Sequence, residues 1–198
     1  TQASGVVPQI SAILGPCAGI AVYSPALTDF VFTVNKISNL FITGPDVIKA
    51  VTGEEVTFEQ LGGAMVHAQK SGVAHFVTQS EKECIAKIKR LLSYLPQNNL
   101  DSPPAVHGAD SESRLTPNLE KIVPLDPKKT YDVRRVVEEI ADRNSFLEIH
   151  EHFAENAVIG LARMNGIAIG LVANQPCVLA GCLDIHSSNK IARFVRFC

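Results

Sequence analysis

The stretch that decides the fold is Gly15-Pro16-Cys17-Ala18-Gly19-Ile20-Ala21-Val22-Tyr23-Ser24-Pro25-Ala26-Leu27-Thr28. It follows an apolar run, Val6–Leu14, whose β-branched residues and lack of charge predict a buried strand. Gly15-Pro16 then predicts a tight turn, and small residues lead into a helix expected from about Gly19 to Leu27. This order of strand, turn and helix start aims backbone N–H groups at whatever lies above the turn.

Those N–H groups would stabilise negative charge on an oxygen without any charged side chain. The small side chains of Ala18, Gly19 and Ala21 leave room for a thioester to approach the backbone. The stretch is therefore a candidate oxyanion hole. The alternative from the residues alone is that a strand-turn-helix unit rich in small residues is simply tightly packed.

Length and composition describe one large globular domain or two small ones, with 198 residues, 46% hydrophobic and 19% charged. A formal net charge of -2, without a cluster of Lys and Arg, argues against a nucleic-acid partner. No apolar stretch reaches the roughly 18 residues of a membrane span, and the start of the chain does not resemble a signal peptide. Five cysteines, mostly within apolar runs, predict reduced and buried thiols in an intracellular compartment.

Capping and turn residues divide the first half of the chain into short elements. Pro45 suits the first position of a helix that Gly53 ends. Thr57 with Gln60, and Ser80 with Glu83, have capping-box spacing. The expected elements are strands over 30–34, 39–42 and 73–77, helices over 45–52, 57–61 and 80–95, and a loop over 67–72.

The composition changes over 97–117, where Pro, Asn, Asp and Ser replace any apolar period and predict an interdomain linker. Beyond it we expect a helix over 133–143 with Asp132 as its N-cap. Asn165-Gly166 between two apolar runs predicts a hairpin. A last helix begins at Ser187, with its apolar side formed by Ile191, Phe194, Val195 and Cys198.

Gly15–Leu27 resembles the GPCAGGAxYSPAL motif of the carboxyltransferase subunits of biotin-dependent acyl-CoA carboxylases. The chain is similar above all to the β subunits of propionyl-CoA carboxylases and to related methylmalonyl-CoA carboxyltransferase and decarboxylase subunits. Further blocks of sequence also resemble the family, and they occur in the family's order and span nearly all 198 residues. These blocks are 40–49, 61–64, 71–75, 92–96, 131–134, 172–176 and 181–198.

The resemblance implies an α/β fold built from crotonase-like (ClpP/crotonase) ββα units in two partial domains. Residues 1–96 would be the rear part of an N-terminal carboxyltransferase domain, 97–117 a linker, and 118–198 the front part of a C-terminal domain. Family subunits hold two complete domains of this kind. We therefore expect this chain to be an internal fragment that is inactive in isolation.

The activity that the resemblance implies is carboxyl transfer from carboxybiotin to a short-chain acyl-CoA, converting propionyl-CoA to methylmalonyl-CoA. The α-proton would pass to the biotin oxyanion left after decarboxylation. The thioester enolate would be held by a backbone oxyanion hole, without a metal or a side-chain nucleophile. The alternatives are a methylmalonyl-CoA decarboxylase or transcarboxylase subunit, and a non-catalytic fragment that serves assembly only.

In this resemblance the oxyanion hole corresponds to the backbone amides of Ile20 and Ala21. The family has glycine where Ile20 stands, so either its side chain enters the core and the amide stays available, or the acyl pocket is altered. Two segments are expected to contact the substrate. One is Cys17, Ala18 and Gly19 beside the hole, and the other is the pair Gly62 and Gly63, which turn chemistry alone would also explain.

The partners implied are an acyl-CoA substrate, a biotin carboxylase or biotin carrier subunit bearing the biotin, and further copies of the chain in a dimer of trimers. We expect no nucleic acid, no metal and no membrane span. The compartment would be the cytoplasm, or the mitochondrial matrix in a eukaryote.

Other side chains have competing interpretations. The stretch 148–152 holds two His and two Glu that suggest zinc, although a solvated strand end explains them better. Cys17 near a helix start is expected to serve packing, and Cys177 and Cys182 to be small core residues. His67 and His75 are candidate general bases, with surface positions as the alternative.

Overall fold

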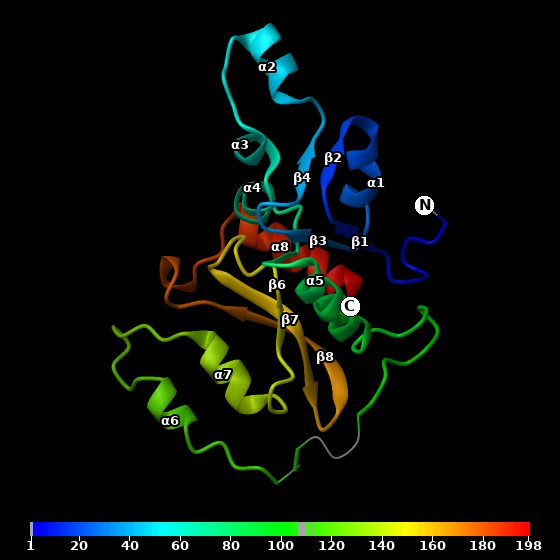
Figure 1. Cartoon of the computed structure of the whole chain (residues 1–198). Coiled ribbons are helices and arrows are strands. Elements are labelled where there is room, and N and C mark those ends of the chain that lie inside the picture. Colours follow the sequence, from blue (N-terminus) through cyan, green and yellow to red (C-terminus); the bar gives the residue numbers. More distant parts are fainter. Residues whose placement is uncertain (1, 107–109, 112) are drawn as a thin grey trace. The chain divides into compact units, whose positions relative to one another are not determined.

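The computed structural model describes residues 2–106, 110–111 and 113–198 (Figure 1). The chain divides into two compact units, residues 1–90 and 91–198. The first unit is built on parallel strands, and the second on an antiparallel sheet.

The first unit contains two small parallel sheets. One has the order β1-β3-β5, formed by Ile10–Ile13, Phe30–Val34 and Phe76–Thr78. The other pairs β2 (Pro16–Ala18) with β4 (Asn39–Phe41). The helical segments are η1 (Gly19–Val22, a 3-10 turn), α1 (Tyr23–Ala26), α2 (Pro45–Thr52), α3 (Phe58–Gly62), α4 (Ala64–Val66), η2 (His67–Ser71, a π-helix) and α5 (Glu81–Leu92).

Strand β3 is the centre of the first unit. All five of its residues are buried, as expected of a central parallel strand that is covered on both faces. The rings of Phe32 and Phe76 stack with centroids 4.4 Å apart across the β3–β5 pair. This order places β1, which leads into Gly15, at one edge of the sheet.

Most of the short elements of the first unit follow their capping residues. Helix α2 begins at Pro45 and ends at Gly53, whose φ of +76° is the left-handed C-cap. Thr57 and Gln60 form both bonds of the predicted capping box. The loop expected over 67–72 is wrong, because η2 continues α4 in helical form until Gly72 ends it at φ +65°.

The second unit has an antiparallel sheet in the order β6-β7-β8, formed by Leu147–Ile149, Ala157–Met164 and Ile167–Asn174. Asn165 and Gly166 connect β7 to β8 with φ of +51° and +76°. Two successive positive φ values define the type I′ turn that matches the twist of the strands, so the predicted hairpin is confirmed. The helical segments are α6 (Leu119–Ile122), α7 (Val133–Ile140), η3 (Leu179–Gly181) and α8 (Ile185–Phe197).

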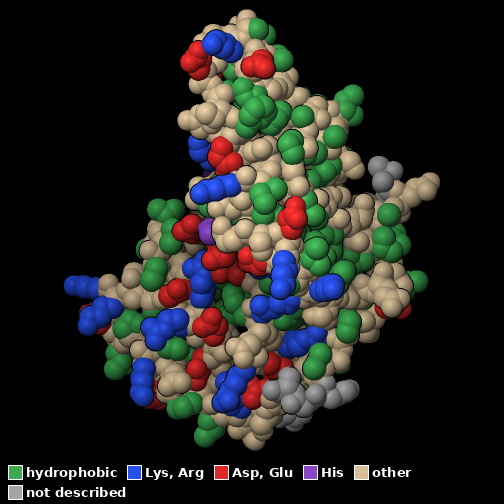
Figure 2. Space-filling view, in the orientation of Figure 1, with side chains coloured by type: hydrophobic (Ala, Val, Ile, Leu, Met, Phe, Trp, Pro, Cys, Tyr) green, Lys and Arg blue, Asp and Glu red, His purple; other side chains and the backbone are tan. Residues whose placement is uncertain are grey.

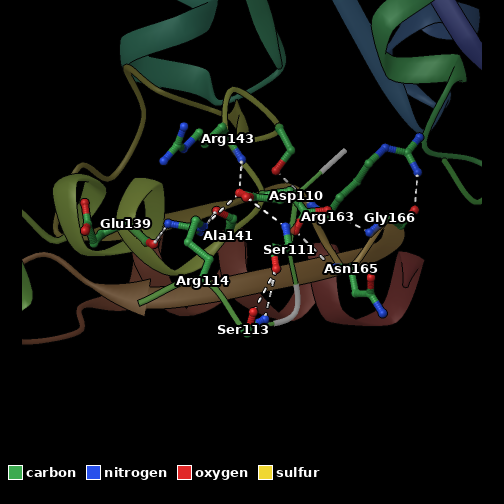
Figure 3. A network of polar contacts seen from close by, with 12 residues as sticks. Asp110, Ser111, Ser113, Arg114, Glu139, Ala141, Arg143, Arg163, Asn165 and Gly166 are labelled. Atoms are coloured by element: carbon green, nitrogen blue, oxygen red, sulfur yellow. Dashed lines mark hydrogen bonds and ion pairs between the residues drawn. The ribbon is translucent and has the colours of Figure 1, made fainter. Parts of the chain in front are cut away.

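Helix α7 begins as predicted, with the Asp132 carboxylate accepting the N–H of Arg134 at 2.9 Å. It ends at Ile140, three residues before the expected boundary. The guanidinium of Arg114 donates to the carbonyl oxygens of Glu139 (2.8 Å) and Ala141 (2.7 Å), which satisfies acceptors at this helix end (Figure 3).

Helix α8 begins at Ile185, and Asp184 and Ser187 form its capping box. Phe194 is buried as expected, but Val195 is 58% exposed, so the prediction that Val195 lines the apolar face is wrong. The residue in its place is Lys190, which shares the buried face with Ser187 and Phe194 through spacings of three and four residues.

Within 97–117, none of the described residues belongs to a helix or strand, while 107–109 and 112 lie outside the described part. The segment nevertheless packs on the second unit. The Val106 N–H donates to the Gly166 carbonyl at 3.0 Å, and a Cβ on Gly166 would lie 1.8 Å from the Val106 oxygen. Further along, Asp110 forms an ion pair with Arg114 at 2.8 Å (Figure 3).

The five cysteines are all free thiols, but only Cys84 is buried. Cys177 and Cys182 are exposed, which corrects the expectation that both are core residues. They lie on either side of η3, in the irregular segment between β8 and α8. Among the described residues, no helix has the length and apolar character needed to cross a membrane.

Candidate active site

The candidate oxyanion hole lies where β2 passes into η1. Pro16–Ala18 pairs with Asn39–Phe41, so the predicted turn at Gly15-Pro16 is instead the start of a second sheet. The chain turns at Gly19, whose φ of +64° favours glycine. The 3-10 helix begins there, and the first N–H groups of a helix lack a carbonyl partner one turn earlier in that helix.

Side chains around this turn point to two sides. Cys17 and Val22 pack against the buried cluster of Ile13, Val31 and Leu40. This contact supports the packing interpretation of Cys17. The remaining side chains of the turn, Ala18, Ile20 and Ala21, are exposed.

Ile20 does not enter the core, because its side chain is 85% exposed. It also does not adopt a positive φ, so the backbone conformation here does not require glycine. The Ile20 carbonyl accepts the N–H of Tyr23, which keeps the turn closed. The isoleucine therefore stands beside the helix start as an exposed apolar side chain.

Gly62 and Gly63 are buried and pack against β4. A Cβ on Gly62 would lie 2.0 Å from the Leu40 carbonyl oxygen, and Gly63 forms an isolated bridge with Asn39. Because β4 also pairs with β2, the glycine pair supports the strand that carries the candidate hole. Close backbone packing therefore accounts for glycine at position 62, whereas a Cβ on Gly63 would first meet the Glu59 side chain, 2.3 Å away.

The two histidine candidates hold backbone in place. Nε2 of His67 lies 2.7 Å from the Leu40 carbonyl oxygen, which only accepts, so Nε2 donates, and Nδ1 lies 2.9 Å from Ser71 Oγ. His75 is 5% exposed and its Nδ1 accepts the Val31 N–H at 3.1 Å. A surface position for His75 is therefore wrong.

The stretch 148–152 gives no metal site. Glu148 is paired with Arg134 at 2.7 Å, and the stretch leaves β6 in a turn. Among the described residues, no group of three or more His, Cys, Asp and Glu is arranged to hold a metal ion.

Sequence reasoning missed the buried charged residues of the second unit. Arg163, 6% exposed, donates to the carbonyl oxygens of Pro104 (2.8 Å), Gly166 (2.9 Å) and Ser93 (2.6 Å). Its guanidinium also lies 4.7 Å from the centre of the Tyr94 ring. The signal was a lone arginine within the otherwise apolar β7, a position where a charge must find internal partners.

The exposed charges form no field of a single sign on the face drawn in Figure 2, where Lys and Arg alternate with Asp and Glu. Apolar side chains are exposed as well, and α2 contains no buried residue, with Val47 51% and Val51 79% exposed.

Comparison with known proteins gives the class and then the family. The chain superimposes on the transcarboxylase 12S subunit with a TM-score of 0.95 and 51% identity, covering 100% of this chain and 38% of that one. It also matches a single-chain long-chain acyl-CoA carboxylase with a TM-score of 0.80 and 25% identity, covering 96% of this chain and 18% of that chain. The fold is α/β and crotonase-like. The family model described as the carboxyl transferase domain matches residues 1–198, and the chain belongs to that family.

Curated relatives agree with this family. The chain is 59% identical over 198 residues to the carboxyltransferase subunit of propionyl-CoA carboxylase from Haloferax mediterranei, covering 100% of this chain and 38% of the relative. It is 53% identical over 195 residues to the α subunit of methylmalonyl-CoA decarboxylase from Propionigenium modestum, covering 98% and 38% respectively. The chain thus spans less than two fifths of the length of these relatives.

Proposed function

We propose that this chain is part of a carboxyltransferase that moves a carboxyl group between carboxybiotin and a short-chain acyl-CoA. Propionyl-CoA and methylmalonyl-CoA are the proposed pair, because the relatives are named for one or the other. The observation that carries the proposal is the exposed start of η1, where the chain turns at Gly19 between small side chains and the first N–H groups have no partner within the helix.

The role proposed for this chain is to stabilise the enolate of the acyl-CoA thioester. Removal of the α-proton puts negative charge on the thioester oxygen, and backbone N–H groups fixed in advance stabilise that charge. Ile20 is the second residue of η1, and the residue three positions before it, Cys17, lies in β2, so no carbonyl of the helix accepts its N–H. Ala21 follows Ala18 by three residues, the spacing that pairs N–H with carbonyl in a 3-10 turn. Ile20 is therefore the stronger donor of the two.

Around these donors, Ala18, Gly19 and Ala21 present no side chain larger than a methyl group. A flat thioester needs this clearance to reach the backbone. Cys17 packs this segment against the buried cluster, while Gly62 and Gly63 pack against β4, the strand paired with β2. In this proposal those three residues position the hole and do not themselves touch the acyl-CoA.

Biotin enters this proposal as a co-substrate, carried in its carboxylated form by a biotin carrier or biotin carboxylase partner, and it supplies the carboxyl group. The described residues of the turn offer neutral amides and small side chains, which suit an acyl thioester and its enolate. We also propose assembly with further copies of the chain, since the 12S transcarboxylase is described as a hexamer.

The compartment proposed is the cytoplasm, with the mitochondrial matrix as the eukaryotic counterpart. The relatives from Sus scrofa and Homo sapiens are named as mitochondrial proteins.

A chimera tests the proposal. The chain replaces the matching segment of the Haloferax mediterranei subunit, and carboxylation of propionyl-CoA is measured with the biotin-bearing partner present. We expect activity in the chimera, and a loss of about 100-fold or more in kcat when Ile20→Pro removes the N–H. Ile20→Ala keeps the N–H and is the matched control. Proline is tolerated in a first helical turn, so Ile20→Pro should remove the N–H without breaking η1.

The same chimera separates the alternatives. A protein that decarboxylates methylmalonyl-CoA but does not carboxylate propionyl-CoA supports the decarboxylase. A chimera that assembles to the size of its parent and turns over neither acyl-CoA supports the assembly-only alternative. Equal kcat for Ile20→Pro and Ile20→Ala would show that this N–H has no part in the reaction.

A further inference from the structure

Lys190 is a buried lysine in the middle of α8, with 3% of its surface exposed. Its Nζ lies within hydrogen-bond distance of four backbone carbonyl oxygens: His150 at 2.9 Å, Phe153 at 2.7 Å, Ala154 at 3.3 Å and Ala157 at 2.7 Å. Among the described residues Lys190 forms no ion pair with a carboxylate. The ammonium is therefore surrounded by neutral oxygens.

All four oxygens belong to residues 150–157, which comprise the connection from β6 to β7 and Ala157, the first residue of β7. Two non-glycine residues of the segment have left-handed backbone, His150 at φ +56° and Ala154 at φ +45°. Each such residue costs about 1 kcal/mol or more and persists only when its surroundings hold it. Four carbonyl dipoles that converge on one point also repel one another unless a cation lies between them.

Charged groups face Lys190 from neighbouring elements. Burial lowers the pKa of Lys190 to about 8, Glu148 and Glu155 raise it, and Arg134 lowers it. The ammonium form therefore predominates at pH 7, and the carbonyl oxygens favour that form.

We propose that the carbonyl oxygens of His150, Phe153, Ala154 and Ala157 form a binding site for a monovalent cation of ammonium size, occupied in this chain by Lys190. Carbonyl oxygens arranged around a point replace the hydration shell of such ions. Removing the lysine side chain should leave a carbonyl cage, formed by these four oxygens, that takes a small primary ammonium ion. The inference concerns the folded chain and does not rest on the proposed function.

The test compares three variants of the whole chain by hydrogen exchange of the amides in 150–157 and by thermal unfolding. Lys190→Ala opens space and removes the charge. Lys190→Met removes the charge and fills the volume of the stem. Lys121→Ala removes an exposed lysine and is the control. Each is measured in methylammonium chloride and in tetramethylammonium chloride, whose cation has no N–H and is too large for the cage.

We expect exchange in Lys190→Ala to be about ten-fold faster or more, the effect of losing one hydrogen bond to a charged group. Methylammonium should reverse this change, and tetramethylammonium should not. Lys190→Met should exchange fast in both salts. The proposal is overturned if Lys190→Met matches the parent chain, or if the two salts have equal effects on Lys190→Ala.

A measurement on the unaltered chain covers the case in which Lys190→Ala does not fold. The ¹⁵N NMR signal of the Lys190 ammonium should exchange slowly with water at pH 6 to 7, with couplings across hydrogen bonds to carbonyl carbons of 150–157. A rapidly exchanging ammonium without those couplings would contradict the site.

Discussion

The guanidinium of Arg134 meets the carboxylate of Glu148 in two parallel hydrogen bonds of 2.7 Å, from Nε and Nη2 to the two carboxylate oxygens. The pair joins the start of α7 to β6. Burial raises the pKa of Glu148, while its bonds from Arg134 act in the opposite direction; the bond to Glu148 raises the pKa of Arg134. Planar two-point pairing of this kind is specific to arginine.

Replacing Arg134 alone should therefore destabilise the fold more than replacing both Arg134 and Glu148. Arg134→Met leaves a largely buried carboxylate without its partner and should lower the free energy of unfolding by about 2 kcal/mol at pH 7. The double variant Arg134→Met with Glu148→Met should recover most of that loss. Urea unfolding of the variants checks this, and a double variant no more stable than the single one would contradict it.

Gly62→Ala should destabilise the first unit severely. Its new Cβ would lie 2.0 Å from the Leu40 carbonyl oxygen, a backbone atom that cannot move without displacing β4. We expect a loss of about 3 kcal/mol or more in unfolding free energy. Gly15→Ala is the matched control, because a Cβ there meets nothing within 4 Å and should change stability by less than about 0.5 kcal/mol. Equal melting curves for the two variants would refute the packing role of Gly62.

Ile20→Gly tests whether the exposed isoleucine crowds the proposed hole. In the chimera described above, the change should raise kcat/KM by about ten-fold, or 1.4 kcal/mol of transition-state stabilisation. Ile20→Ala should give most of the gain, because the conformation of Ile20 does not require glycine. Unchanged kinetics in both variants would mean that this side chain points away from the bound thioester.

Acid should weaken the start of α8. Hydrogen bonds from the Ser187 backbone and side chain lower the pKa of Asp184 to about 2. A carboxyl group whose pKa is lower in the folded chain than its unfolded value near 4 stabilises the fold at pH values above 4. This stabilisation is lost as the pH falls from about 4 to about 2. Asp184→Asn should therefore flatten the fall of unfolding free energy in that window. A slope as steep as that of the parent chain would show that Asp184 does not contribute to the loss of stability in acid.

Elements whose ends are marked by local chemistry could be predicted from the sequence. Pro45 with Gly53, Thr57 with Gln60, and Asn165-Gly166 each fix backbone within a few residues, so α2, α3 and the hairpin were predicted correctly. The family resemblance and the fold class also rest on local motifs, and both are confirmed.

Features that depend on distant partners could not be predicted. The pairing of Pro16–Ala18 with β4 turned a predicted turn into a strand, and hydrogen bonds from Arg114 end α7 early. Periodicity assigned Val195 to the buried face of α8. Lys190 is buried there instead, and its ammonium group lies within hydrogen-bond distance of carbonyl oxygens of residues 150–157. The candidate hole was located by its motif, whereas the exposure of Ile20 required the structure.

The two units also differ in how far apart along the chain their paired strands lie. The hairpin of β7 and β8 closes through two residues, whereas β3 and β5 pair across 44 positions, as between Phe32 and Phe76. Hairpins form in about 1–10 μs, and distant parallel pairing is slower because a long loop must close first. During synthesis, the apolar β3 leaves the ribosome well before β5 exists to cover it. The first unit is therefore the part of this chain most exposed to aggregation while it folds, and the part for which a chaperone would matter most.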